Sequence, residues 1–200
     1  MNVHHYPGRA AAAIAAAVLL ACTSTPAQAA TTANTASGSQ TVPSGSWGAV
    51  PSRNTAAPYG SGPLTLSFPN NGGVGNPSFT PVYFTVGNTG TLPITAANYG
   101  GSTSAQPPVQ FTLESCSTTW NEGTGACPGG SVATILTASG SSTIQATPGP
   151  APASQGAGIR LRARANSDGS GNVPKTPAST LTLNISVDRT QVRTATTTSG

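Results

Sequence analysis

The chain has 200 residues, only 6% of which are charged, and its formal net charge is +4. It contains two histidines, His4 and His5, four acidic residues and one lysine. Acid-base catalysis, activated nucleophiles and metal ligation depend mainly on these residue types and on cysteine. The composition therefore argues against an enzyme, and we expect no cofactor and no bound metal.

Residues 1–29 have the pattern of an export signal. His4, His5 and Arg9 form a weakly basic start, a short apolar run spans residues 10–21, and the segment ends in Ala27-Gln28-Ala29, which fits signal peptidase. The apolar run is shorter than the roughly 20 residues that a membrane-spanning helix needs. We expect a secreted protein of bacterial type.

A second interpretation of the same segment stays open. Leu19-Leu20-Ala21-Cys22 is similar to a lipobox, in which Cys22 would be acylated and become the new N-terminus. The protein would then be anchored by lipid to the outer face of the cell membrane. Either cleavage leaves Cys116 and Cys127 as an even pair in an oxidising compartment.

Residues 30–62 are predicted to form a flexible arm. They are mainly Thr, Ser, Gly, Ala and Pro, and only Val42, Trp47, Val50 and Tyr59 are large enough to be worth burying. Such a composition favours an extended chain over a packed one. The arm would be a spacer between the cell surface and a domain, or an unstructured N-terminus without a role of its own.

Residues 63–193 are predicted to form a single antiparallel β-sandwich of about seven strands, followed by a polar tail over 194–200. Short runs of strand-forming residues recur between Gly, Pro, Asn and Ser, and no helical periodicity is present. Irregular spacing and proline-rich connections favour a sandwich over an up-and-down barrel, which is the alternative. The predicted strands are 64–68, 82–86, 109–115, 132–137, 143–146, 159–165 and 181–187.

Two runs resemble immunoglobulin-like (Ig-like) modules on bacterial surfaces, including the camelysin and biofilm-fibre group. Tyr83 to Ile94, with the sequence YFTVGNTGTLPI, looks like a strand, an Asn-x-Gly turn and a second strand. Gly156 to Leu161 is similar to the Gly-led strand that follows a Pro-rich turn in these modules. The resemblance implies an Ig-like fold, and it implies no activity because the metal-ligating positions of that group have no counterpart here.

Cys116 and Cys127 are expected to form a disulfide that closes a local loop. The loop carries Trp120, Asn121 and Glu122. These side chains could form a platform for a sugar or a contact for a protein. In the structural alternative, Trp120 covers the disulfide and the sheet edge.

Arg160, Arg162 and Arg164 are predicted to lie on one face of one strand, because side chains alternate with a period of two. Arg189 and Arg193 would extend this stripe if the last strand is adjacent. A guanidinium stripe could bind an anionic cell-wall polymer. Alternatively, it is a solvated face whose charges prevent edge-to-edge pairing with another molecule.

A hydrolase would have to use an atypical carboxylate site around Glu114, Glu122 and Asp168. Asp168 lies in a segment, 166–172, with the spacing of the first half of a calcium loop. The residue at position 12 is Pro177 instead of Glu, so we predict a turn between two strands.

These features together predict a secreted, non-enzymatic β-sandwich protein of the cell surface or extracellular matrix with an adhesive, structural or partner-binding role. The expected partners are other surface proteins, further copies of the chain, or cell-wall polymer. We expect no nucleic-acid partner, and membrane contact only through a lipid at Cys22. The alternatives are a binding module for anionic cell-wall polymer and a hydrolase.

Overall fold

The computed structural model describes residues 32–35, 38–41, 45–105, 109–167, 169 and 172–188. The chain divides into two compact units, residues 1–44 and 45–200. In the first unit, β1 (Thr32–Thr35) and β2 (Gly38–Thr41) pair antiparallel. Several predictions fall outside the described residues, namely those for segment 1–29, Cys22, Asp168, Arg189, Arg193 and the tail 194–200.

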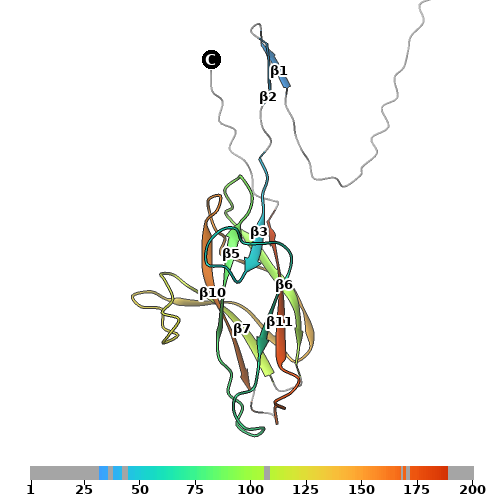
Figure 1. Cartoon of the computed structure of the whole chain (residues 1–200), viewed down its shortest axis with the longest axis vertical. Coiled ribbons are helices and arrows are strands. Elements are labelled where there is room, and N and C mark those ends of the chain that lie inside the picture. Colours follow the sequence, from blue (N-terminus) through green and yellow to red (C-terminus); the bar gives the residue numbers. More distant parts are fainter. Residues whose placement is uncertain are drawn as a thin grey trace, which may run out of the picture. The chain divides into compact units, whose positions relative to one another are not determined.

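The second unit is an all-β sandwich of nine antiparallel strands in two sheets (Figure 1). The first sheet has the order β3-β5-β10-β7-β8, and the second has the order β4-β11-β6-β9. The strands of the first sheet are β3 (Ala49–Ser52), β5 (Val82–Asn88), β10 (Gly158–Ser167), β7 (Val109–Cys116) and β8 (Val132–Ser139). Those of the second are β4 (Leu64–Phe68), β11 (Ser179–Val187), β6 (Ala97–Ser104) and β9 (Ser142–Gly149).

The core lies between the two sheets, because apolar residues alternate with polar ones along the strands and turn to the same side. Leu161 and Ala163 of β10 belong to the same cluster of buried side chains as Leu181 and Leu183 of β11. The rings of Phe68 and Phe111 meet edge to face, with centroids 5.6 Å apart. Among the residues described, the structure has no helix long and apolar enough to cross a bilayer.

All seven predicted strands are present, and most extend one to three residues beyond the predicted ends. Two further strands of the sandwich, β3 and β6, were not predicted. The Asn-x-Gly turn is also present, since Asn88 Oδ1 accepts the Gly90 N–H at 2.8 Å and its side-chain amide donates to the Leu92 carbonyl at 2.9 Å. The second strand of that motif is not where it was expected, because residues 89–96 form no strand and β6 begins at Ala97.

Residues 45–62, which were predicted to belong to the arm, belong to the sandwich unit instead. Strand β3 pairs with β5, placing Ala49 opposite Asn88. The buried Tyr59 ring lies over Gly87 and Gly158, where an added Cβ would approach its atoms to 2.0 and 2.6 Å. Its hydroxyl donates to the Gly156 carbonyl at 2.8 Å. One short edge strand and one buried tyrosine are therefore enough to dock a segment whose composition is typical of a linker.

Candidate functional site

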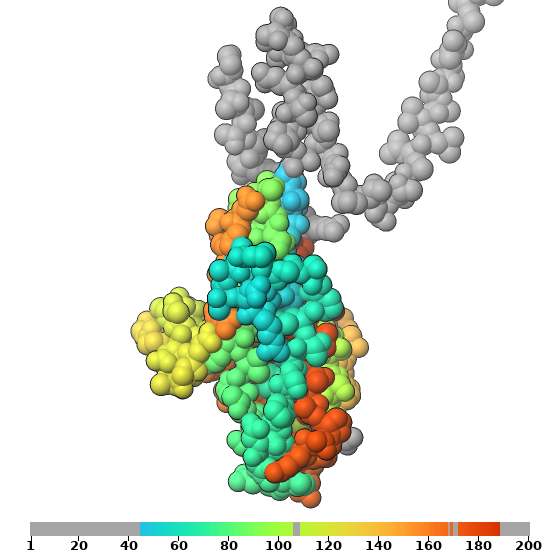
Figure 2. Space-filling model, in the orientation of Figure 1, coloured from blue at the N-terminus to red at the C-terminus, as the bar shows by residue number. Residues whose placement is uncertain are grey.

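A disulfide joins Cys116 and Cys127, as predicted, with the two Cα atoms 5.6 Å apart. The chain from residue 117 to 131, called the lobe below, stands out from the side of the sandwich (yellow in Figure 2). Its exposed residues are small or polar, and Asn121, Glu122, Gly123 and Thr124 form an exposed turn. The turn is ordered by its own backbone, because Asn121 exchanges hydrogen bonds with Ala126 and Gly125 at 2.9 and 2.8 Å.

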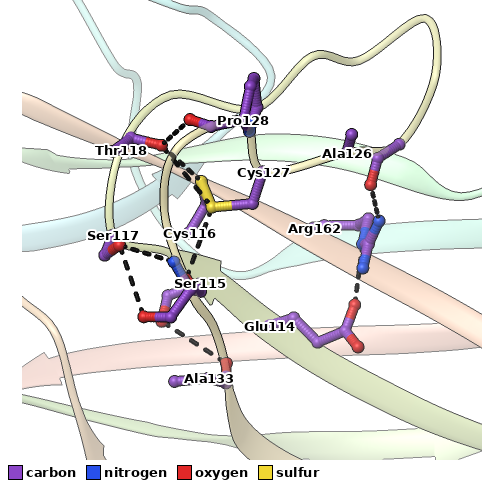
Figure 3. Close-up of a disulfide and its surroundings, with 12 residues drawn as sticks. Glu114, Ser115, Cys116, Ser117, Thr118, Ala126, Cys127, Pro128, Ala133 and Arg162 are labelled. Carbon is purple, nitrogen blue, oxygen red and sulfur yellow. Dashed lines mark hydrogen bonds and ion pairs between the residues drawn. A yellow bond between two sulfur atoms is a disulfide. The ribbon is translucent and has the colours of Figure 1, made fainter.

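The base of the lobe is fixed beside the disulfide by hydroxyl groups (Figure 3). Ser117 Oγ accepts the backbone N–H of Ser131 at 2.9 Å, and the Ser117 N–H donates to the Ser131 carbonyl at 3.0 Å. Thr118 Oγ1 donates to the Pro128 carbonyl at 3.0 Å. The disulfide thus reinforces a neck that is already paired by hydrogen bonds.

The Trp120 side chain attaches the lobe to the outer face of the first sheet. The residue is only 5% exposed, and its indole packs edge to face on Tyr83, with ring centroids 6.0 Å apart. The Arg162 guanidinium carbon lies 4.2 Å from the centroid of the Trp120 ring, in a cation-π contact. Since both partners belong to the sheet, the indole packs inward and is not displayed as a platform for a sugar.

Arg162 is the centre of this attachment. The strand register places it directly opposite Glu114 on β7 and Tyr83 on β5. Its Nε donates to Glu114 Oε2 at 2.7 Å (Figure 3). Its Nη1 donates to the Gly125 carbonyl of the lobe. The side chains of Arg162 and Glu114 are only 11% and 9% exposed. One buried guanidinium therefore links two strands of the sheet to the lobe.

The other two arginines of the predicted stripe also have carboxylate partners. Arg160 binds both oxygens of Glu122, with Nε at 2.6 Å and Nη2 at 3.1 Å. Arg164 Nη1 lies 3.5 Å from the second oxygen of Glu114, and the Arg164 side chain is 41% exposed. The three guanidiniums do share one face, as alternation predicted, but two carboxylates compensate most of their charge.

The Arg160 guanidinium lowers the pKa of Glu122 below its usual value, chiefly by hydrogen bonding to the carboxylate. A depressed pKa in the folded state stabilises the fold above the unfolded pKa of about 4.3, and this stability is lost as the pH falls through the lower folded value. Because Glu122 is 44% exposed, we expect an effect below about 1 kcal/mol. Urea unfolding of wild type and Glu122→Gln should differ at pH 7 and converge in acid; a gap that persists in acid would contradict this.

Loss of the disulfide should lower the free energy of unfolding by about 3 kcal/mol, because the crosslink restricts the unfolded chain. The comparison is between wild type and Cys116→Ser/Cys127→Ser in urea. Trp120 should remain in contact with Tyr83 in this variant, since the indole is held by the sheet and not by the sulfur atoms. A red-shifted, solvent-like tryptophan emission from Trp120 under native conditions would contradict that view; Trp47→Phe in both proteins removes the other tryptophan.

A cavity of about 430 Å³ lies beside the base of the lobe. It is lined by residues 115–119, by Pro150 and by the start of β10 from Gly158 to Leu161. Arg160 is the one lining residue with a charged side chain, and it is already bonded to Glu122. The cavity walls therefore offer hydroxyls and backbone groups for binding, and no carboxylate or imidazole that could act as a base.

The two described carboxylates of the hydrolase alternative, Glu114 and Glu122, are both bonded to arginines of β10, and Asp168 lies outside the described residues. Glu114, on β7, binds Arg162 and Arg164, and Glu122, on the lobe, binds Arg160. No group of three or more His, Cys, Asp or Glu residues that could hold a metal occurs in the part of the chain that the structure describes. The sequence did not indicate that Tyr83 and the carbonyl of Gly125 lie beside Arg162. The one available signal was alternation along β10, which places Arg162 on the outer face; that Tyr83 of β5 lies opposite it follows only from the strand register.

Comparisons with protein-family models, characterised proteins and solved structures found no match to this chain.

Proposed function

We propose that the protein is an exported, non-enzymatic module of the cell surface or extracellular matrix, with an Ig-like β-sandwich that presents the lobe to a partner. The partner would be a surface protein or another copy of the chain. Export rests on the sequence of residues 1–29, and the Ig-like assignment rests on the two runs quoted above.

The observation that carries this proposal is the use of the charged side chains. The glutamates and the strand arginines that would serve catalysis bind one another and hold the lobe in place. A rigid loop loses little conformational entropy when a partner binds, so pre-organisation favours affinity. The exposed turn at residues 121–124 is the surface that this scaffold presents.

A binding module for anionic polymer receives less support from the same geometry. Arg162 is buried under Trp120, and Arg160 is bonded in bidentate fashion to Glu122. Arg164 is the most exposed guanidinium of the three, and it has Glu114 beside it. A polymer would have to displace these carboxylates before it could bind.

The test is retention of the purified protein on cell-wall and cell-surface fractions at about 0.05 and 0.5 M NaCl, a range over which charge screening becomes strong. We expect salt-resistant retention, or self-association on a sizing column, that falls about tenfold in Gly123→Arg, as for a central interface residue. Gly73→Arg is the matched control, because Gly73 has open space around its Cβ position and lies in another loop.

Two results would contradict the proposal. Retention that disappears at high salt and in Arg164→Gln, but not in Gly123→Arg, would favour the anionic-polymer alternative. Absence of both retention and self-association would remove the partner-binding function.

A further inference from the structure

The outer face of the second sheet is built from hydroxyl groups in cross-strand rows. Side chains of β11 alternate, so Leu181 and Leu183 face the core while Thr180 and Thr182 face outward. The registers align Thr182 with Thr65 on β4 and with Ser102 on β6, and align Ser102 with Thr143 on β9. One row of hydroxyl residues, Thr65, Thr182, Ser102 and Thr143, thus crosses all four strands.

A second row lies next to the first. Thr180 is opposite Ser67 on one side and Ser104 on the other. Strands are spaced about 4.8 Å apart, and residues on one face recur about every 6.7 Å along a strand, so the two rows form a regular lattice. We refer to these seven residues as the hydroxyl face; they are Thr65, Ser67, Ser102, Ser104, Thr143, Thr180 and Thr182.

None of the seven residues of the hydroxyl face is charged. The Thr65 and Thr182 hydroxyls share a hydrogen bond of 3.0 Å, and Arg53 Nη2 donates to the backbone carbonyl of Thr65 at 3.3 Å, at the edge strand β4. Five of its members are exposed and Thr180 and Thr182 are half-buried within the sheet. The four strands β4, β11, β6 and β9 contain no Asp, Glu, Lys, Arg or His, and their aromatic residues, Phe68 and Tyr99, are fully buried in the core. The ion pairs described above all belong to the other sheet and its lobe.

The neutral hydroxyl groups of this face indicate which class of partner it fits. A hydroxyl both donates and accepts hydrogen bonds, which matches the hydroxyls of a sugar, while a charged polymer gains no Coulomb energy from a neutral face. A sheet face of short Ser and Thr side chains offers a broad contact surface and not the concavity that encloses a small ligand. Repeated weak contacts become significant only when the partner is extended and repetitive.

We infer that the hydroxyl face binds the surface of an extended, neutral, insoluble polysaccharide. This inference goes beyond the proposed function, because it adds a second partner on a face that the lobe does not use. The lobe and the hydroxyl face belong to opposite sheets, so one module can contact a protein partner with one side and a polysaccharide with the other.

The test is depletion of the protein from solution by microcrystalline cellulose and by chitin. We expect depletion by at least one of them that is equal at about 0.05 and 0.5 M NaCl, because no charge contributes. The partition constant should fall about tenfold in Thr65→Val/Thr143→Val/Thr182→Val, which removes hydroxyls while keeping β-branched shape. The matched control, Thr112→Val/Thr134→Val/Thr137→Val, makes the same change on the outer face of the other sheet and should stay within about twofold.

A second pair of variants tests whether loss of binding in the triple variant could come from altered folding. Ser102→Lys places one charge in the middle of the first row at an exposed position, and Thr137→Lys is its control on the other sheet. Depletion that is unchanged in Ser102→Lys and in the triple variant, or no depletion by either polysaccharide, would overturn the inference. If the protein is still retained on cell-surface fractions and Gly123→Arg still lowers that retention about tenfold, the proposed function stands and only the polysaccharide assignment fails.

Discussion

Arg162→Met should lower the free energy of unfolding by about 3–5 kcal/mol, because it leaves a buried carboxylate without its main partner. Of its two arginine partners Glu114 would retain Arg164, whose nitrogen lies at 3.5 Å and whose side chain is 41% exposed. The variant also loses the bond to the Gly125 carbonyl and the cation-π contact with Trp120. Urea unfolding at pH 7, followed by circular dichroism, measures the loss.

Two further variants separate charge from packing in this prediction. Arg162→Met/Glu114→Leu removes both charges, and we expect it to recover most of the lost stability, since apolar replacement of a buried ion pair is often neutral or better. Arg160→Met, whose partner Glu122 is 44% exposed, should cost less than about 1 kcal/mol. If Arg160→Met and Arg162→Met lowered the free energy of unfolding equally, burial of an ion pair would not determine its contribution to stability in this protein.

The interaction of Arg162 with Glu114 explains which part of the site the sequence could predict. Alternation along residues 159–165 places three arginines on one face without any knowledge of the fold. The partners of these arginines depend on strand order, and nothing local in the sequence states that β10 lies between β5 and β7. Glu114 and Glu122 are 48 and 38 positions away from the arginines that they bind.

There are also physical reasons why two strands, β3 and β6, were not predicted from the sequence. Strand β6 presents Tyr99, Gly101 and Thr103 to the interior, so it lacks the regular apolar alternation that identifies a strand. Strand β3 has four residues and includes Pro51, which normally argues against a strand except at an edge. β3 is in fact an edge strand, and the hydroxyl face could not be predicted without β6.

Gly101→Ala should destabilise the fold by roughly 3 kcal/mol or more, which combines backbone strain with a close contact. Gly101 has a φ of 145°, in a region that other residues rarely adopt, and it lies at a register shift between β6 and β9. An added Cβ would lie 1.9 Å from the carbonyl oxygen of Thr182 on β11. That oxygen belongs to a central strand, so it cannot move away without disturbing the pairing of both neighbours.

The measurement is urea unfolding of Gly101→Ala beside Gly73→Ala, whose Cβ would meet nothing within 4 Å and whose stability should change by less than about 1 kcal/mol. Any folded Gly101→Ala protein should also bind polysaccharide less well, because Ser102 and Thr182 lie on either side of the disturbed contact. Two variants that unfold at the same urea concentration would mean that β6 tolerates a side chain at this position. The close approach of β6 and β11 would then not be what aligns the hydroxyl face.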